Sequence, residues 1–228
     1  MESRRLPVAL LVALALAWFG PLFVAARAYP SGYDWRHDVV SNLANPRDNP
    51  KSWRIAADGM AVTGIFLALL SLEVRRRLRP LAPAWSNAAA AFLVLGGALL
   101  TVSALILPGH HAFFGIGKAH AKIAQAAGIA LGLAMACTLP ALLRLQRSHA
   151  RVRAAAVGLV VIPITLFLLC HFLTPVAEAH APPDQRDAIH HSLPASLAFW
   201  EWTGSVAVFG FLALVTLALP SDPSRPGP

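Results

Sequence analysis

The polar segment from Tyr29 to Arg54, YPSGYDWRHDVVSNLANPRDNPKSWR, separates the first two long apolar runs of the chain. It combines prolines, aspartates and asparagines with His37 and Ser41. Connections in compact proteins are usually about 4–6 residues long, so a segment of this length and mixture predicts a structured cap rather than a tether. Asp38, Ser41 and Asn42 have the i, i+3, i+4 spacing of one helical face, and we expect any chemistry to gather around this cap.

The composition on either side of this segment is that of a membrane protein. Hydrophobic residues make up 57% of the chain and charged residues 13%, whereas a soluble domain carries about 25% charged residues. Apolar runs of about 20 residues are long enough to cross a hydrocarbon core of about 30 Å. The net charge of +8 does not indicate a nucleic-acid partner, because the arginines lie in short segments between apolar runs, where they determine topology.

We therefore predict an all-α, polytopic bundle of six transmembrane helices that forms one domain over residues 1–228. The expected spans are residues 6–28, 55–74, 86–107, 119–143, 154–174 and 193–219. A cleaved signal peptide is the alternative for the first span, but the apolar part of a signal peptide is only about 7–15 residues long. Pro175 is expected to end the fifth span, and the GxxxG pattern of Gly128 and Gly132 indicates close helix contact.

The distribution of positive charge predicts the orientation. Eleven of the nineteen Lys and Arg residues fall on the side of the bundle that contains Arg75 to Arg79. Basic residues in short loops stay in the cytoplasm. We expect a multi-pass protein of the cell inner membrane with both termini in the cytoplasm and the cap outside, in contact with the lipid bilayer.

Ionisable residues inside the expected spans form the candidate site. Asp58, His120, His171 and Glu201 come from four different spans and are expected at similar depth beneath the cap. Such residues are costly in hydrocarbon, usually face the interior of the bundle, and are functional candidates by default. This pattern predicts a polar, histidine-rich site at the extracytoplasmic face.

Three interpretations of this site remain open. In the first, histidines bind zinc, which lowers the pKa of a bound water and enables hydrolysis. The candidate metal ligands are His110, His111, His120, His171, His190 and His191, and the candidate catalytic residues are Asp38, Ser41, Asp58 and Glu201. Metal motifs such as HxxxH or HExxH are missing, so this interpretation requires histidines from different segments to come together in the folded protein.

In the second interpretation the same residues form a hydrogen-bonded, ion-paired plug that fixes the register of the helices. In the third, two histidines hold a haem as in b-type cytochromes, which requires facing histidines well inside the helices. Ser41 is a nucleophile only if a base such as His37 is positioned beside it, and otherwise it is a helix-cap or turn residue.

The segments GYDWRHDVVSNLANP (residues 32–46) and NPKSWRIAADGMAVTGIFLAL (residues 49–69), with a histidine opening the fourth span, resemble a known family. It is the bacterial and archaeal six-span family catalogued as domain of unknown function nine-nine-eight. The resemblance implies six helices and marks Ser41, Asn42, Leu43, Asn45, Pro46, Asp58, Gly59, Gly64 and His120. A fainter similarity to membrane ceramidase-like hydrolases implies a lipid-like substrate.

Two functional hypotheses follow from these patterns. The first is a metal-dependent hydrolase or transferase that acts on a lipid-like substrate entering from the outer leaflet. The alternative is a non-enzymatic membrane accessory or small-molecule-binding protein whose buried polar residues are structural. The sequence does not indicate the substrate or the oligomeric state.

Overall fold

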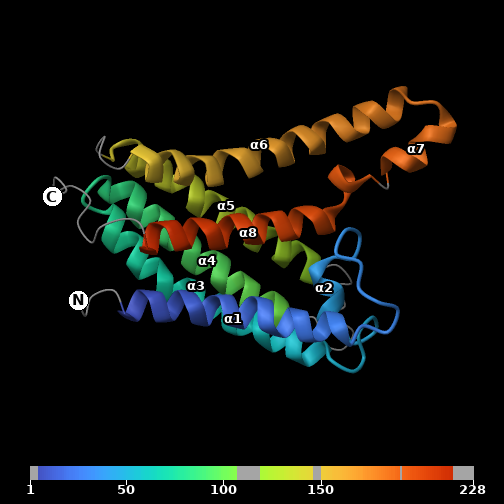
Figure 1. Ribbon diagram of the computed structural model, residues 1–228, viewed down its shortest axis with the longest axis horizontal. Coiled ribbons are helices and arrows are strands. Elements are labelled where there is room, and N and C mark those ends of the chain that lie inside the picture. Colours follow the sequence, from blue (N-terminus) through green and yellow to red (C-terminus); the bar gives the residue numbers. More distant parts are fainter. Residues whose placement is uncertain (1–4, 107–118, 146–149, 191, 218–228) are drawn as a thin grey trace.

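The computed structural model describes residues 5–106, 119–145, 150–190 and 192–217, and every regular element in these ranges is helical. The long helices run side by side along the length of the molecule (Figure 1). The elements are α1 (Arg5–Arg27), α2 (Val40–Leu43), α3 (Trp53–Leu78), α4 (Pro83–Ile106), α5 (Ala119–Leu143), α6 (Ala150–His180), α7 (Pro183–His190), the 3-10 helix η4 (Leu193–Ala195) and α8 (Leu197–Leu217).

Among the described residues, six helices are long and apolar enough to cross a membrane: α1, α3, α4, α5, α6 and α8. The shortest of them has 21 residues, which at about 1.5 Å per residue matches the thickness of a hydrocarbon core. Large apolar side chains on the outside, such as Leu16 at 66% and Ile129 at 64% exposed, are therefore solvated by lipid. The prediction of an all-α, six-helix bundle is confirmed, and the chain is a multi-pass integral membrane protein.

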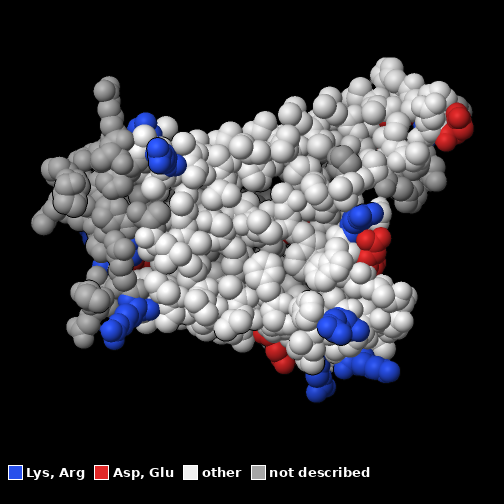
Figure 2. Space-filling model, in the orientation of Figure 1, with Lys and Arg blue, Asp and Glu red and all other residues white. Residues whose placement is uncertain are grey.

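Charged side chains gather at the two ends of the molecule, and the middle of the visible face is almost entirely uncharged (Figure 2). We call the end that contains the α3–α4 connection the arginine end. There Glu73, which is 8% exposed, accepts two hydrogen bonds of 2.8 Å from Arg76. It also pairs with Arg77, whose side chain is fully buried. These arginines belong to α3 itself, because the helix ends at Leu78 rather than at the expected residue 74.

Helix α3 packs against α4 at two glycines that bring the backbones together. A Cβ atom added to Gly64 would lie 2.2 Å from the carbonyl oxygen of Gly97, and one added to Gly97 would lie 2.4 Å from the carbonyl oxygen of Gly64. Close to this crossing, the Thr101 hydroxyl donates a 3.0 Å hydrogen bond to the Ala61 carbonyl oxygen. Small residues at such crossings let helices approach closely in membranes, where van der Waals packing drives helix association.

The opposite side of α3 packs against α1 in the same way. A Cβ atom added to Gly59 would lie 2.5 Å from the side chain of Pro21 and 2.7 Å from the carbonyl oxygen of Ala17. By contrast, a Cβ atom added to Gly128 or Gly132 of α5 would meet nothing within 4 Å. The prediction of a close helix contact at these two glycines is therefore wrong, because that side of α5 faces away from the neighbouring helices.

Helix α6 differs most from its predicted bounds. It runs from Ala150 to His180 through Pro163 and Pro175, so the prediction that Pro175 ends the span is wrong. A proline removes one backbone hydrogen bond, but membrane helices tolerate this because local adjustments satisfy the freed carbonyl group. The C-terminal half of α6 diverges from the other helices and leads into α7 (Figure 1).

The contact between α3 and α4 leads to a test of the fold. We expect Gly64→Ala to lower the unfolding free energy in detergent by about 1–3 kcal/mol, because overpacking a tight contact forces the backbones apart. Gly128→Ala is the matched control, since its new methyl group meets no neighbour. SDS titration followed by circular dichroism measures both variants. Equal midpoints for Gly64→Ala and the unmodified protein would contradict the close contact.

Candidate functional site

The cap, defined as residues 28–52 between α1 and α3, is inserted into the bundle by the apolar residues of α2. Val40 is 4% exposed and Leu43 is fully buried. Both belong to a core cluster that includes Leu22 of α1 and Met60 of α3. The cap is thus a packed part of the fold, as the length and composition of the segment indicate.

A chain of aromatic rings connects the cap to α8. The ring centroids of Tyr29 and Tyr33 are 5.6 Å apart, those of Tyr33 and Trp35 are 5.1 Å apart, and those of Trp35 and Trp202 are 4.7 Å apart. Burial is the main cause that raises the pKa values of Tyr29 and Tyr33 above the ordinary value of tyrosine. Aromatic pairs of this kind contribute about 0.5–1.5 kcal/mol each beyond their burial.

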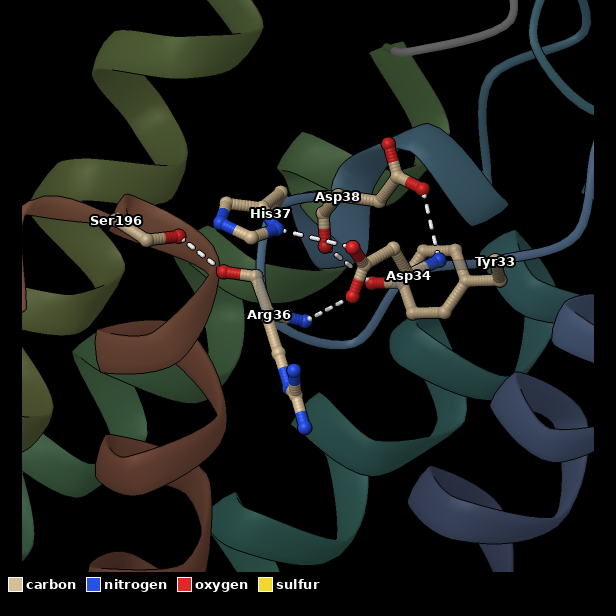
Figure 3. A network of polar contacts seen from close by, with 6 residues as sticks. All are labelled: Tyr33, Asp34, Arg36, His37, Asp38 and Ser196. Atoms are coloured by element: carbon tan, nitrogen blue, oxygen red, sulfur yellow. Dashed lines mark hydrogen bonds and ion pairs between the residues drawn. The ribbon is translucent and has the colours of Figure 1, made fainter. Parts of the chain in front are cut away.

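Hydrogen bonds within residues 33–38 fix the shape of the cap near α8 (Figure 3). The Asp34 carboxylate accepts 2.9 Å bonds from the backbone N–H of Arg36 and from Nδ1 of His37. The Asp38 carboxylate accepts the backbone N–H of Asp34 at 2.9 Å, and the Asp38 carbonyl oxygen accepts the Tyr33 hydroxyl at 2.6 Å. The hydrogen bond from His37 is the main cause that lowers the pKa of Asp34.

Two side chains near the start of α8 hold the cap from the other side. The Glu201 carboxylate accepts a 2.7 Å hydrogen bond from the backbone N–H of Val40, and the Ser196 hydroxyl donates to the carbonyl oxygen of Arg36. The N-cap residue of α2, Val39, has no side-chain acceptor of its own. Glu201 therefore caps α2 from a helix that is 161 residues away along the chain. A carboxylate at this position is also favourable to the partial positive charge of a helix N-terminus.

Asn49 connects the cap to α1. Its side chain is fully buried, and its amide group donates 3.1 Å bonds to the carbonyl oxygens of Ala25 and Leu43. Its own amide oxygen accepts the Ser52 hydroxyl at 2.8 Å. Asn49 could not be singled out from the sequence, because one asparagine among several in a polar segment carries no signal of burial.

The residues predicted to be catalytic each have their own contacts in the structure, and their catalytic role stays a prediction. The helix α2 begins at Val40, so the expectation that Asp38 shares a helical face with Ser41 and Asn42 is wrong. Asp38 bonds the cap backbone, Ser41 is a half-buried residue of α2, and Asp58 is exposed on α3. Glu201 is bonded to the cap backbone.

Two of the six predicted metal ligands, His120 and His171, have described side chains, and each has its own contacts. Nδ1 of His120 donates a 3.0 Å bond to the carbonyl oxygen of Ser103 and so connects α5 to α4. His171 is exposed on α6, and its ring stacks on that of Phe167 with centroids 5.8 Å apart. Three of the other predicted ligands, and the side chain of a fourth, lie outside the described residues: His110, His111, His191 and His190. Within the described part of the chain, no three His, Cys, Asp or Glu side chains are grouped to hold one metal ion. The zinc site stays a prediction.

An open groove lies where the cap meets α8, with a volume of about 510 Å³. Its lining residues are Trp35, Arg36, Leu193, Phe199, Trp202, Thr203 and Val206. The four residues from α8 have the i, i+3, i+4, i+7 spacing of one helical face, so the groove follows α8 for about 10 Å. This groove was not predicted from the sequence, although the spacing of these residues could have indicated one continuous face of the sixth expected span.

These features define the chain as a multi-pass helical membrane protein whose cap is hydrogen-bonded to its last helix and borders an aromatic groove. Comparisons with protein-family models, curated proteins and solved structures found no match. The resemblance to domain of unknown function nine-nine-eight therefore stays a prediction.

The contact between Glu201 and Val40 can be tested by hydrogen exchange. We expect Glu201→Ala to speed exchange of the Val40 amide by roughly tenfold to a hundredfold, because a hydrogen bond to a charged group contributes about 1.5–3 kcal/mol. Ser205→Ala is the matched control, because the Ser205 hydroxyl bonds the Glu201 carbonyl oxygen one turn away rather than the cap. Unchanged exchange at Val40 in Glu201→Ala would show that Glu201 does not hold the cap.

Proposed function

We propose that this protein is a membrane-embedded binding protein that holds a lipid-like molecule in the groove between the cap and α8. The observation that supports this proposal is the groove itself, formed mainly by Trp35, Phe199, Trp202 and Val206. Ligand pockets are typically about 300–1,000 Å³, mostly apolar, with a few polar groups that orient the ligand. The groove has a volume in this range and a mostly apolar lining, and it is open rather than enclosed.

The openness of the groove favours a ligand that remains partly in the bilayer. Val206 is 60% exposed and lies about one turn along α8 beyond Trp202, which contacts the cap. In a membrane this side of the groove faces lipid chains, while Trp35 and Trp202 lie at the cap end, where aromatic residues favour the interface. A molecule with one polar end and one apolar chain fits both environments.

The carboxylates of Glu201 and Asp38 already accept hydrogen bonds from the cap backbone, which favours binding over hydrolysis. Glu201 accepts the Val40 N–H, and Asp38 accepts the Asp34 N–H. A general base has to be within hydrogen-bond reach of the proton that it abstracts, whereas these carboxylates serve the cap backbone. Buried polar residues with a structural role are what the non-enzymatic hypothesis predicts.

The proposal includes an orientation in the cell inner membrane. The arginine end lies in the cytoplasm, because basic residues in short connections are retained there. Both ends of the described chain, Arg5 and Leu217, lie on that side, since six spans separate them. The groove then opens toward the outer leaflet.

The orientation is tested with single cysteines in a Cys137→Ala/Cys170→Ala background. We expect Asp184→Cys, at the cap end, to react with a membrane-impermeant maleimide in intact cells, and Arg79→Cys, at the arginine end, to react only after lysis. Both native side chains are exposed, so access to the reagent depends on the side of the membrane. The reverse pattern would refute the orientation.

Ligand binding is tested by photocrosslinking in nanodiscs with a phosphatidylcholine that carries a diazirine in its acyl chain. We expect saturable labelling of α8 that falls by roughly tenfold, or about 1.4 kcal/mol, in Val206→Trp, because the indole fills the groove. Ile129→Trp is the control, since Ile129 is a similarly exposed apolar residue on α5. Equal labelling of the two variants, or labelling of the unmodified protein that does not saturate, would contradict the proposal.

A further inference from the structure

We infer that Arg36 makes the groove selective for lipids with an anionic head group, which the guanidinium binds through a phosphate or carboxylate. This inference rests on the proposed function and specifies the class of its ligand. It follows from how the backbone of Arg36 is held, from what its side chain contacts, and from where the groove places an anion.

The backbone of Arg36 is fixed from both sides. Its N–H donates a 2.9 Å hydrogen bond to the Asp34 carboxylate, and its carbonyl oxygen accepts the Ser196 hydroxyl. These two bonds hold the Cα atom between the cap and the start of α8. The side chain extends away from this network and alongside α8 (Figure 3), so that Arg36 is one of the residues that line the groove.

The guanidinium of Arg36 forms no ion pair or hydrogen bond within the described part of the chain. Other arginines are engaged: Arg76 and Arg77 by Glu73, and Arg54 by the ring of Trp53. The two acidic residues nearest in sequence accept other donors: Asp34 accepts the Arg36 N–H and His37, and Asp38 accepts the Asp34 N–H. The guanidinium therefore keeps its donors available for a ligand.

An unpaired surface arginine is ordinarily just a solvated charge. Arg36 differs because it lines the groove together with apolar residues such as Trp202 and Val206. Water is scarcer beside such a surface, so the attraction between unlike charges is stronger than in bulk water. Guanidinium groups bind phosphate and carboxylate through two parallel hydrogen bonds, which also orients the ligand.

The lining of the groove favours a lipid over a free anion. Phe199 and Val206 offer apolar contact over about 10 Å of α8, and Leu193 of η4 extends it. A small inorganic ion cannot use this contact. An acyl chain gains about 0.8 kcal/mol for each CH₂ group that it buries. The ligand that satisfies both parts of the groove has its anion at Arg36 and its chain along α8.

The test is competition against the photoreactive phosphatidylcholine in nanodiscs. For the unmodified protein we expect phosphatidylglycerol, which is anionic, to displace the probe about tenfold more effectively than unlabelled phosphatidylcholine. In Arg36→Gln this preference should disappear, because the amide carries no charge to distinguish the net negative head group of phosphatidylglycerol from the phosphate of phosphatidylcholine, which its own choline group neutralises. The apolar lining and the backbone bonds of residue 36 are retained. Arg36→Lys should keep a reduced preference, since it retains the charge but not the paired hydrogen bonds.

Arg47→Gln is the matched control, because Arg47 is an exposed arginine of the same cap that does not line the groove. It should keep the full preference for phosphatidylglycerol. Saturable labelling without any preference in the unmodified protein would overturn the role of Arg36 and leave the proposed function standing. Labelling that never saturates would overturn both. Displacement by inorganic phosphate as effective as by phosphatidylglycerol would overturn the lipid as the ligand.

Discussion

The fold depends on the close contact of α3 with the helices on either side of it. Gly64 and Gly97 bring the backbones of α3 and α4 together, and Gly59 admits Pro21 of α1. Lipid chains are as apolar as leucine side chains, so burial from water does not drive these helices together. Dense backbone packing supplies the attraction instead. This packing also fixes the position of the end of α1 relative to the start of α3, and the cap connects these two points.

Within this helix bundle, polar side chains mainly form hydrogen bonds to backbone groups. Thr63 donates to the Gly59 carbonyl oxygen at 2.7 Å, and Thr138 donates to the Met135 carbonyl oxygen at 2.6 Å. Asn49 and Glu201 do the same for the cap, over longer distances in sequence. A buried group without a partner is costly in an apolar environment. The same requirement explains why several residues that look functional in the sequence hold the structure together.

The sequence predicts the six helices well because the length and hydropathy of a span follow directly from the thickness of the bilayer. It also predicts a structured cap. The bounds of α6 are predicted less well, because a proline ends helices in water more often than in lipid. The composition of the candidate site could not be predicted, since the pairing of Glu201 with Val40 depends on how α8 is rotated. Periodicity places Glu201 in a span, but it does not say which neighbour its side chain meets.

The length of α6 has a consequence for how the protein fits its surroundings. The helix has 31 residues, and its stretch without charged residues, 154–177, is about 36 Å long, longer than a hydrocarbon core of about 30 Å. Its outer half has few protein neighbours. Hydrophobic mismatch is relieved by tilting a helix or by deforming the bilayer around it, at a fraction of a kcal/mol per Å. Helix α6 leads through α7 and η4 into the start of α8. A change in membrane thickness that alters the tilt of α6 therefore also moves the start of α8, where the groove lies.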